Sequence, residues 1–123
     1  MTCELNIAGG VCVCVCFAIG GLVEVGGALF YSNAISKSKS RMDMTVLKSD
    51  TGGTSWPKGV LVYSGDAAYS ALCETQNASE IGLAYEREWT DVKVAIGASS
   101  SIWWTTVPTD LPPYSHPPAR DAV

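Results

Sequence analysis

The feature that most constrains this chain is an apolar stretch near its amino-terminal end. Residues 7–31 read IAGGVCVCVCFAIGGLVEVGGALFY, and Glu24 is the single charged residue among these twenty-five. As an α-helix rising ~1.5 Å per residue, the stretch would be about 37 Å long, which is enough to cross a hydrocarbon layer of roughly 30 Å. Its many Ile, Val, Leu and Phe residues favour insertion by more than one acidic residue opposes it. The stretch therefore predicts a single transmembrane helix over residues 7–31.

Two alternatives compete with this helix. A secretory signal peptide should begin with basic residues, whereas MTCELN contributes Glu4 and no Lys or Arg. A β-strand over residues 11–17 fits the strict alternation of apolar residues with three cysteines. That strand would account for only seven of the twenty-five residues, so the helix is preferred.

Composition agrees with a membrane location and argues against one class of partner. Hydrophobic residues make up 47 % of the chain and charged residues 16 %, below the quarter or so that is usual for globular domains. The net charge of -4 offers no basic surface for phosphates, so we expect no nucleic-acid binding.

The orientation of the helix follows from its flanks. Four basic residues, Lys37, Lys39, Arg41 and Lys48, follow the stretch and none precedes it. By the positive-inside rule, the carboxyl-terminal part would face the cytosol, matrix or stroma. Asn77-Ala78-Ser79 matches the acceptor for N-glycosylation, which requires the opposite, lumenal side. Because such acceptors often arise by chance, the basic residues are preferred, and an organellar membrane (thylakoid or mitochondrial inner) is one expected location.

On a helix, five residues at four-residue spacing would form one face. They are mostly small, and small residues let transmembrane helices approach closely. This predicted helix-packing interface consists of Cys12, Cys16, Gly20, Glu24 and Ala28. The carboxyl of Glu24 would be turned inward, where it would either bond to a neighbouring helix or act as a proton relay or cofactor ligand.

The sequence contains few other candidate ligands. Cys12, Cys14 and Cys16 are spaced C-x-C-x-C, which on a helix cannot converge on one ion, so we expect no metal site. Five cysteines, mostly inside the presumed span, predict no disulfide framework. His116 is the single histidine, which leaves it, with Glu24, as a candidate ligand for a pigment or other unidentified cofactor.

The rest of the chain predicts a small extramembrane region. After a short flank at residues 1–6, the span at 7–31 and a basic connector at 32–41, residues 42–107 predict an irregular α+β unit. Strands are expected at 44–48, 59–63 and 92–96, and helices at 66–75 and 77–89. Trp103 and Trp104 would anchor in a bilayer interface or in a pocket of a partner protein.

Residues 108–123 hold five of the six prolines and predict an extended Pro-rich tail. Such a tail is a passive end, a recruiting ligand for another module, or a segment held by a neighbour.

No arrangement of residues typical of an enzyme occurs in the sequence, so we expect a protein without catalytic activity. The leading hypothesis is a single-pass accessory subunit of a larger membrane complex, such as a photosystem or respiratory-chain assembly. It would contact other membrane subunits and lipid. The alternatives are a free membrane adaptor with a recruiting tail, or a soluble α+β binding protein with residues 11–17 as a buried strand.

Overall fold

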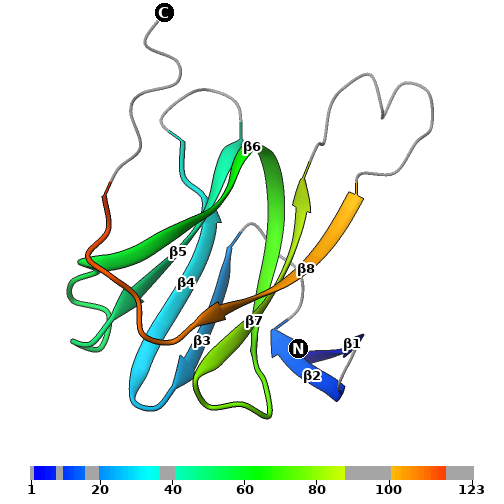
Figure 1. Cartoon of the computed structure of the whole chain (residues 1–123), viewed down its shortest axis with the longest axis horizontal. Helices are drawn as coiled ribbons and strands as arrows, with labels where there is room; N and C mark the ends of the chain where they lie inside the picture. Colours follow the sequence, from blue (N-terminus) through cyan, green and yellow to red (C-terminus); the bar gives the residue numbers. More distant parts are fainter. Residues whose placement is uncertain (1, 8–9, 16–19, 37–40, 88–100, 116–123) are drawn as a thin grey trace, which may run out of the picture.

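The computed structural model describes residues 2–7, 10–15, 20–36, 41–87 and 101–115, and within them every regular element is a β-strand (Figure 1). The strands are β1 (Thr2–Ile7), β2 (Gly10–Val15), β3 (Gly21–Val25), β4 (Ala28–Ala34), β5 (Met42–Ser49), β6 (Lys58–Glu74), β7 (Glu80–Arg87) and β8 (Ser101–Pro108). All strand pairings are antiparallel, and they join these strands into one sheet.

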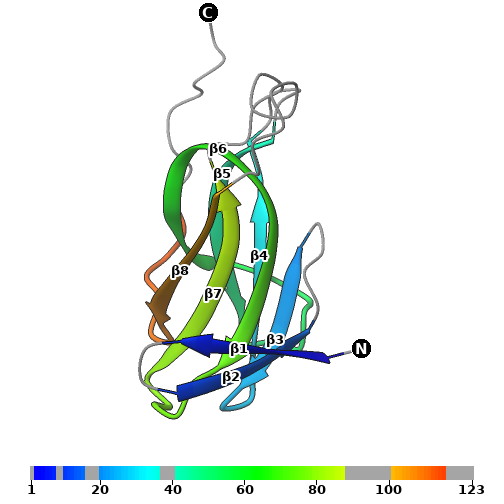
Figure 2. The same ribbon diagram turned by 90° about the vertical axis from the view of Figure 1, so that its right-hand side faces the viewer.

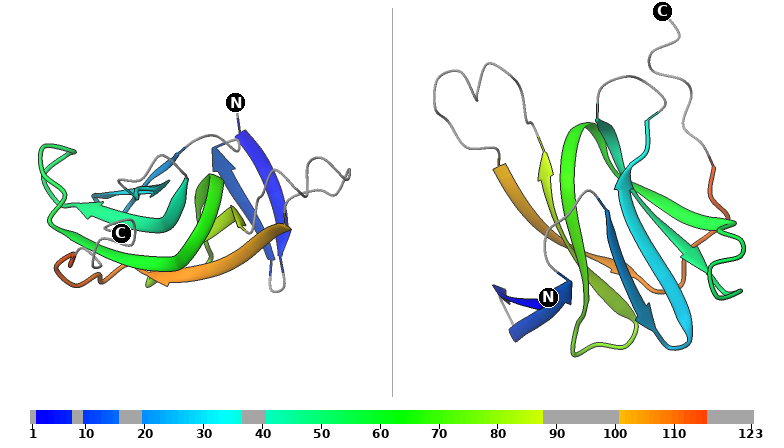
Figure 3. Two further views of the ribbon diagram at one scale, coloured as in Figure 1. Left: turned by 90° about the horizontal axis from the view of Figure 1, so that it is seen from above. Right: turned by 180° about the vertical axis from the view of Figure 1, so that it is seen from behind.

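Strand β6 organises the sheet because it belongs to both of its halves. Its first part pairs with β5, from Lys48↔Lys58 to Met42↔Asp66. Strand β5 in turn pairs with β4, and β4 pairs with β3. Its second part pairs with β7, which pairs with β8. Gly65, with a φ of 145°, lies where one set of pairings gives way to the other. Strand β6 curves along its length, and the two halves of the sheet form a half-barrel (Figure 3).

The core fills the space between the two halves of the sheet. Phe30, Met44 and Val46 come from β4 and β5, and they are fully buried. The opposite half contributes Leu72, Ile81, Leu83, Tyr85 and Val107, which join them in one cluster. At this interface Ser32 and Ser70 share a hydrogen bond of 2.8 Å between their hydroxyls, and Ser32 Oγ also accepts from Gly21 N. These bonds satisfy polar groups that would otherwise be costly to bury.

The transmembrane helix predicted over residues 7–31 is wrong. The described residues of this range form the end of β1, β2, β3 and part of β4, and in the described part of the chain no helix is long and apolar enough to cross a membrane. The prediction of a single-pass membrane protein with an α+β region is corrected to an all-β antiparallel fold. The alternative that placed a strand at residues 11–17 agrees with β2 as far as Val15.

The physical reason lies in the glycines that interrupt this stretch. Gly26 and Gly27 have φ values of 61° and 83° and form a two-residue turn between β3 and β4. Two consecutive positive φ values are what the tight turn favoured in hairpins requires, and glycine adopts them without strain. On β3, Val23 and Val25 pack against the core while Glu24 is exposed. Apolar residues that face the core therefore alternate with exposed residues along β3, which is the pattern of a strand and not of a helix.

The two predicted helices at 66–75 and 77–89 are also wrong, because residues 66–87 form the second part of β6, a turn and β7. At the start of the second range, Asn77 Oδ1 accepts from Ser79 N at 2.9 Å within the hairpin turn. Side-chain bonds of this kind stabilise turns as readily as helix ends. The strands expected at 44–48 and 59–63 are confirmed within β5 and β6. The strand expected at 92–96 lies outside the described residues.

The hairpin of β1 and β2 runs at a steep angle to the other strands (Figure 2) and is joined to β6 by a single register pair, Cys14↔Cys73. Cys73 is disulfide-bonded and fully buried. The absence of a larger disulfide framework stays a prediction, because the side chains of the other four cysteines lie outside the described part of the structure.

The described part of the Pro-rich tail packs against the fold. Gly59 N donates to Pro112 O at 2.9 Å, and Tyr114 N donates to Pro57 O at 2.8 Å. Leu111 is 3 % exposed and joins the core cluster. Residues 109–115 are thus held by their own chain, and binding of the tail to another protein stays a prediction.

Candidate binding surface on strand β8

The described residues of the predicted helix-packing interface do not lie on a common helix face. Cys12 is on β2, Gly20 precedes β3, and Ala28 is buried at the start of β4. Glu24 is exposed on β3, opposite Leu29 of β4, so it is not a carboxyl buried among helices. Cys16 is outside the described residues.

One of the two expected cofactor ligands lies within the described residues. Glu24 stands on an exposed strand face, and His116 lies outside the described residues, so the role of either as a ligand stays a prediction. In the ranges that the structure covers, no three His, Cys, Asp or Glu side chains are grouped so that they could hold a metal ion.

The two tryptophans of β8 have different environments, because neighbouring residues of a strand point to opposite faces. Trp104 lies over Gly82 of β7, where its ring occupies the space that a Cβ would need. This tryptophan is half-buried, and its ring packs within its own sheet. Trp103 is opposite Tyr85 in the register and is 40 % exposed. Of the two expected anchors, Trp103 is thus the one more available to a partner.

Trp103 takes part in an arginine–aromatic cluster formed by Tyr63, Tyr85, Arg87 and Trp103. The guanidinium carbon of Arg87 lies 3.4 Å from the centroid of the Trp103 ring and 4.5 Å from that of the Tyr63 ring. The rings of Tyr63 and Tyr85 are 6.3 Å apart, and Arg87 Nη1 donates to the Tyr85 hydroxyl at 3.5 Å. Each stacking of a cation on a ring contributes on the order of 0.5 to 2 kcal/mol. The cluster therefore holds the Trp103 ring in place.

Strand β8 is an edge of the sheet in the described structure, since its register pairs are all with β7. The pairing runs without a shift from Arg87↔Ser101 to Glu80↔Pro108. Ile102 is 68 % exposed, and residues 101–107 include no charged side chain. Proteins commonly protect edge strands from pairing with other chains by charges, prolines or bulges. Apart from Pro108 at its end, β8 carries none of these.

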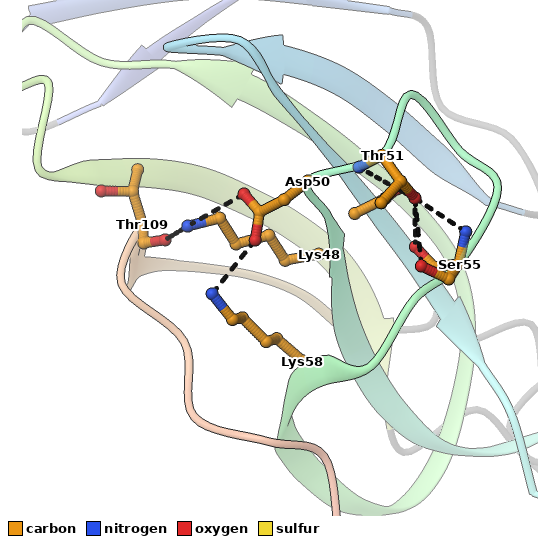
Figure 4. Close-up of polar contacts among 7 residues, drawn as sticks. Lys48, Asp50, Thr51, Ser55, Lys58 and Thr109 are labelled. Atoms are coloured by element: carbon orange, nitrogen blue, oxygen red, sulfur yellow. Dashed lines mark hydrogen bonds and ion pairs between the residues drawn. The ribbon is translucent and has the colours of Figure 1, made fainter.

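A second polar cluster, drawn in Figure 4, joins β5, β6 and the carboxyl-terminal segment. Lys58 Nζ lies 3.0 Å from Asp50 Oδ2, and Lys48 Nζ lies 3.9 Å from Asp50 Oδ1. Lys48 Nζ also donates to Thr109 O at 2.8 Å. The hydrogen bond from Lys58, supported by the charges of both lysines, lowers the pKa of Asp50 below its ordinary 3.8. With one carboxylate and two ammonium groups, the cluster is suited to fixing the segment at Thr109.

Neighbouring hydroxyls order the turn that follows Asp50. Ser55 N donates to Thr51 Oγ1 at 2.9 Å, and the hydroxyls of the two residues are 3.0 Å apart (Figure 4). Gly53 N donates to Ser49 Oγ at 2.9 Å. These bonds satisfy backbone donors within the turn, so they have a structural role.

Comparison of the chain with protein families, with curated proteins and with solved structures gives no match. The geometry of the surface therefore carries the functional argument.

The sequence indicated part of this surface. It singled out Trp103, but it did not indicate Arg87, Tyr63 or the exposed side chain of Ile102. The available signal was the run from residue 101 to 107, whose β-branched and aromatic residues are typical of a strand. Strand formation at this position places Trp103 beside β7, although the sequence does not specify which strand will be its neighbour.

Proposed function

We propose that this chain is a non-catalytic binding domain whose partner is a protein that adds an extended segment to the edge of β8. The observation that carries the proposal is the exposed, uncharged edge of β8 with Ile102 and Trp103 on it. An extended segment pairs with such an edge through main-chain hydrogen bonds and gains specificity from alternate side chains.

The arginine–aromatic cluster supports a binding role for the same strand. Tryptophan, tyrosine and arginine are the residues that most often dominate the energetics of protein interfaces. Arg87, which lies over the rings of both Tyr63 and Trp103, orders the tryptophan before a partner arrives. An ordered side chain loses less conformational entropy on binding, which favours affinity.

This proposal retains one part of the role expected from the sequence. An accessory subunit of a larger assembly needs a surface that contacts its neighbours, and the helix face predicted for that purpose is replaced by strands. In the proposed form of this role, β8 makes the contact with the neighbouring protein. Contact of the chain with membrane lipid is not part of the proposal.

A library of eight-residue peptides displayed against the full chain tests the proposal. We expect selected peptides to alternate apolar residues, and methylation of their backbone nitrogens should weaken binding at least tenfold, because it removes main-chain donors. Ile102→Lys should weaken binding by a similar factor, since a charge on an edge strand opposes pairing. Leu22→Lys is the matched control: Leu22 is 50 % exposed on β3, whose register pairs are with β4 only, and binding should be unchanged.

Peptide binding that Ile102→Lys leaves intact would overturn the assignment to β8. Selection of no peptide would do the same. Binding of the chain to lipid vesicles that is lost in Trp103→Ala, without peptide binding, would favour a bilayer anchor over the proposed protein contact.

A further inference from the structure

The turn between β6 and β7 carries the triplet Asn77-Ala78-Ser79, and all three residues are exposed. It is the one place in the chain where an Asn is followed two residues later by Ser or Thr, since Asn6 and Asn33 are followed by Ala8 and Ile35. The triplet lies between two strands, where a bulky group projects into solvent without displacing any core residue.

The turn presents the reactive atom of Asn77 outward. Its Oδ1 accepts from Ser79 N at 2.9 Å, and its backbone carbonyl accepts from Glu80 N at 3.1 Å. Its Nδ2 makes no hydrogen bond to a residue that the structure describes. These bonds fix the turn through the backbone and Oδ1, so a substituent on Nδ2 costs no contact of the fold.

The disulfide of Cys73 supplies an independent argument about the compartment. Structural disulfides form and persist in the oxidising lumen of the secretory pathway and outside the cell, and are rare in the cytosol. The basic residues after residue 36 opposed lumenal placement only through the positive-inside rule, which applies to segments that flank a membrane span. The stretch before them forms strands, so the rule has no span there to act on.

We propose that Asn77 carries an N-linked glycan, attached in the oxidising lumen in which the disulfide of Cys73 forms. The donor class is an oligosaccharide joined to a lipid through a diphosphate. Nδ2 of Asn77 attacks the anomeric carbon of the first sugar and a new C–N bond forms. The bond from that carbon to the diphosphate oxygen breaks, the lipid diphosphate leaves with the electron pair, and Nδ2 gives up one proton to a base of the transferase.

The position of the glycan leaves the β8 surface open. Glu80, next to the triplet, pairs with Pro108, whereas Ile102 pairs with Glu86 at the other end of the same strands. Six residues of strand separate these ends by about 20 Å. The glycan therefore projects from the opposite end of β7 and β8, and its presence does not depend on the proposed function of β8.

The test is production of the full chain with its own amino terminus in a eukaryotic cell, followed by digestion with an N-glycosidase. We expect the mobility of the chain to increase after digestion and residue 77 to be recovered as aspartate by mass spectrometry. Asn77→Gln and Ser79→Ala should each abolish the shift completely, while Ser79→Thr should keep it. Asn33→Gln, an amide substitution outside any acceptor triplet, is the matched control and should leave it unchanged.

A second measurement separates loss of the acceptor from loss of the fold. Mass spectrometry of the chain alkylated before reduction should find Cys73 protected in the wild type, Asn77→Gln and Ser79→Ala. Recovery of Asn77 unmodified from a chain with an intact disulfide would overturn the proposal, as would a free thiol at Cys73 or a shift that persists in Asn77→Gln.

Discussion

Gly82 shows how a single missing side chain determines the packing of a neighbour. The ring of Trp104 occupies the space that a Cβ at this position would need, and Cys73 Sγ lies 2.8 Å from the same point. The close approach allows a large aromatic ring to cover the strand next to the disulfide. Gly82 is therefore required by packing, and its role does not depend on an unusual φ.

We expect Gly82→Ala to lower the free energy of unfolding by about 1–3 kcal/mol, because the added methyl overpacks this site. Chemical denaturation of the folded chain measures the effect. The control is the same substitution in a Trp104→Ala background, where space is available and the cost should be much smaller. Equal costs in the two backgrounds would show that Trp104 is not the group that excludes the methyl.

Asp50 gives a prediction about pH. Its pKa is lowered by the hydrogen bond from Lys58 and by the two lysine charges, so the folded state favours the ionised form. The resulting stabilisation is present above the ordinary value of 3.8 and is lost as the pH falls through the lowered pKa. Asp50→Asn should therefore reduce stability slightly at pH 7, and the difference from wild type should vanish at about pH 2.

The measurement for Asp50 is the thermal midpoint between pH 2 and 7, at low and high salt. The side chain is half-exposed, so high salt should shrink the difference. Asp110→Asn is the control, since Asp110 is exposed and has no ion pair within the described residues, and its curve should follow wild type. A difference for Asp50→Asn that is constant with pH would contradict the ion-pair explanation.

Among the elements, the carboxyl-terminal segment 109–115 completes the core although it is not a strand. Leu111 fills a place in the main cluster, and Lys48 fixes the backbone at Thr109. The prolines of this segment predict an extended tail, because they exclude a regular element. Prolines nevertheless allow a neighbouring side chain to be buried. Burial needs only an apolar side chain and hydrogen-bond partners for the backbone groups around it.

Leu111→Ala should lower the free energy of unfolding by about 2–4 kcal/mol, as expected for a truncated buried leucine. Leu22→Ala is the control, because Leu22 is half-exposed, and its cost should stay below about 1 kcal/mol. Denaturant titration measures both. A similar small cost for both leucines would mean that the segment does not belong to the core in solution.

The strands that local sequence patterns indicate were the predictable part of this fold. Strands were expected at residues 44–48 and 59–63 from their local pattern, and both are present. The Gly-Gly pair at 26–27 is typical of a hairpin turn. The apolar character of the whole stretch favoured a helix instead. The second part of β6 was not predictable from local preference. Its alanines and leucine suit a helix, and its strand form depends on pairing with β7 and on packing against β4.

On the scale of the whole molecule, the disulfide of Cys73 is buried in the centre of the sheet. A disulfide typically stabilises a fold by about 2–4 kcal/mol, mainly by restricting the unfolded chain. Cys73→Ala should therefore lower the free energy of unfolding by about 2–5 kcal/mol. The measurement is denaturation with and without a reducing agent.

The reducing agent also provides a control for the effect of Cys73→Ala. It should destabilise the wild type and have no further effect on Cys73→Ala, since the crosslink is already absent. Loss of stability on reduction in both proteins would place the effect elsewhere, and no loss in either would contradict a stabilising role for the disulfide.

The candidate surface, like the disulfide, depends on contacts that are remote in sequence. Tyr63 and Trp103 are forty residues apart, and the guanidinium of Arg87 lies over both of their rings. No local sequence pattern predicts these contacts of Arg87 with the two rings, because they follow from the bend of β6 and from the pairing of β7 with β8. The sequence could therefore indicate an exposed tryptophan but not the guanidinium that orders it.

The bend of β6 also determines how the molecule opens. One continuous strand supplies hydrogen-bond partners to both halves, and the core lies between them, so separation of either half from β6 exposes the core that the two halves share. Amide protons of β5 and β7 should then exchange with solvent through the same global opening, at closely similar free energies. The half-barrel would thus unfold as one cooperative unit.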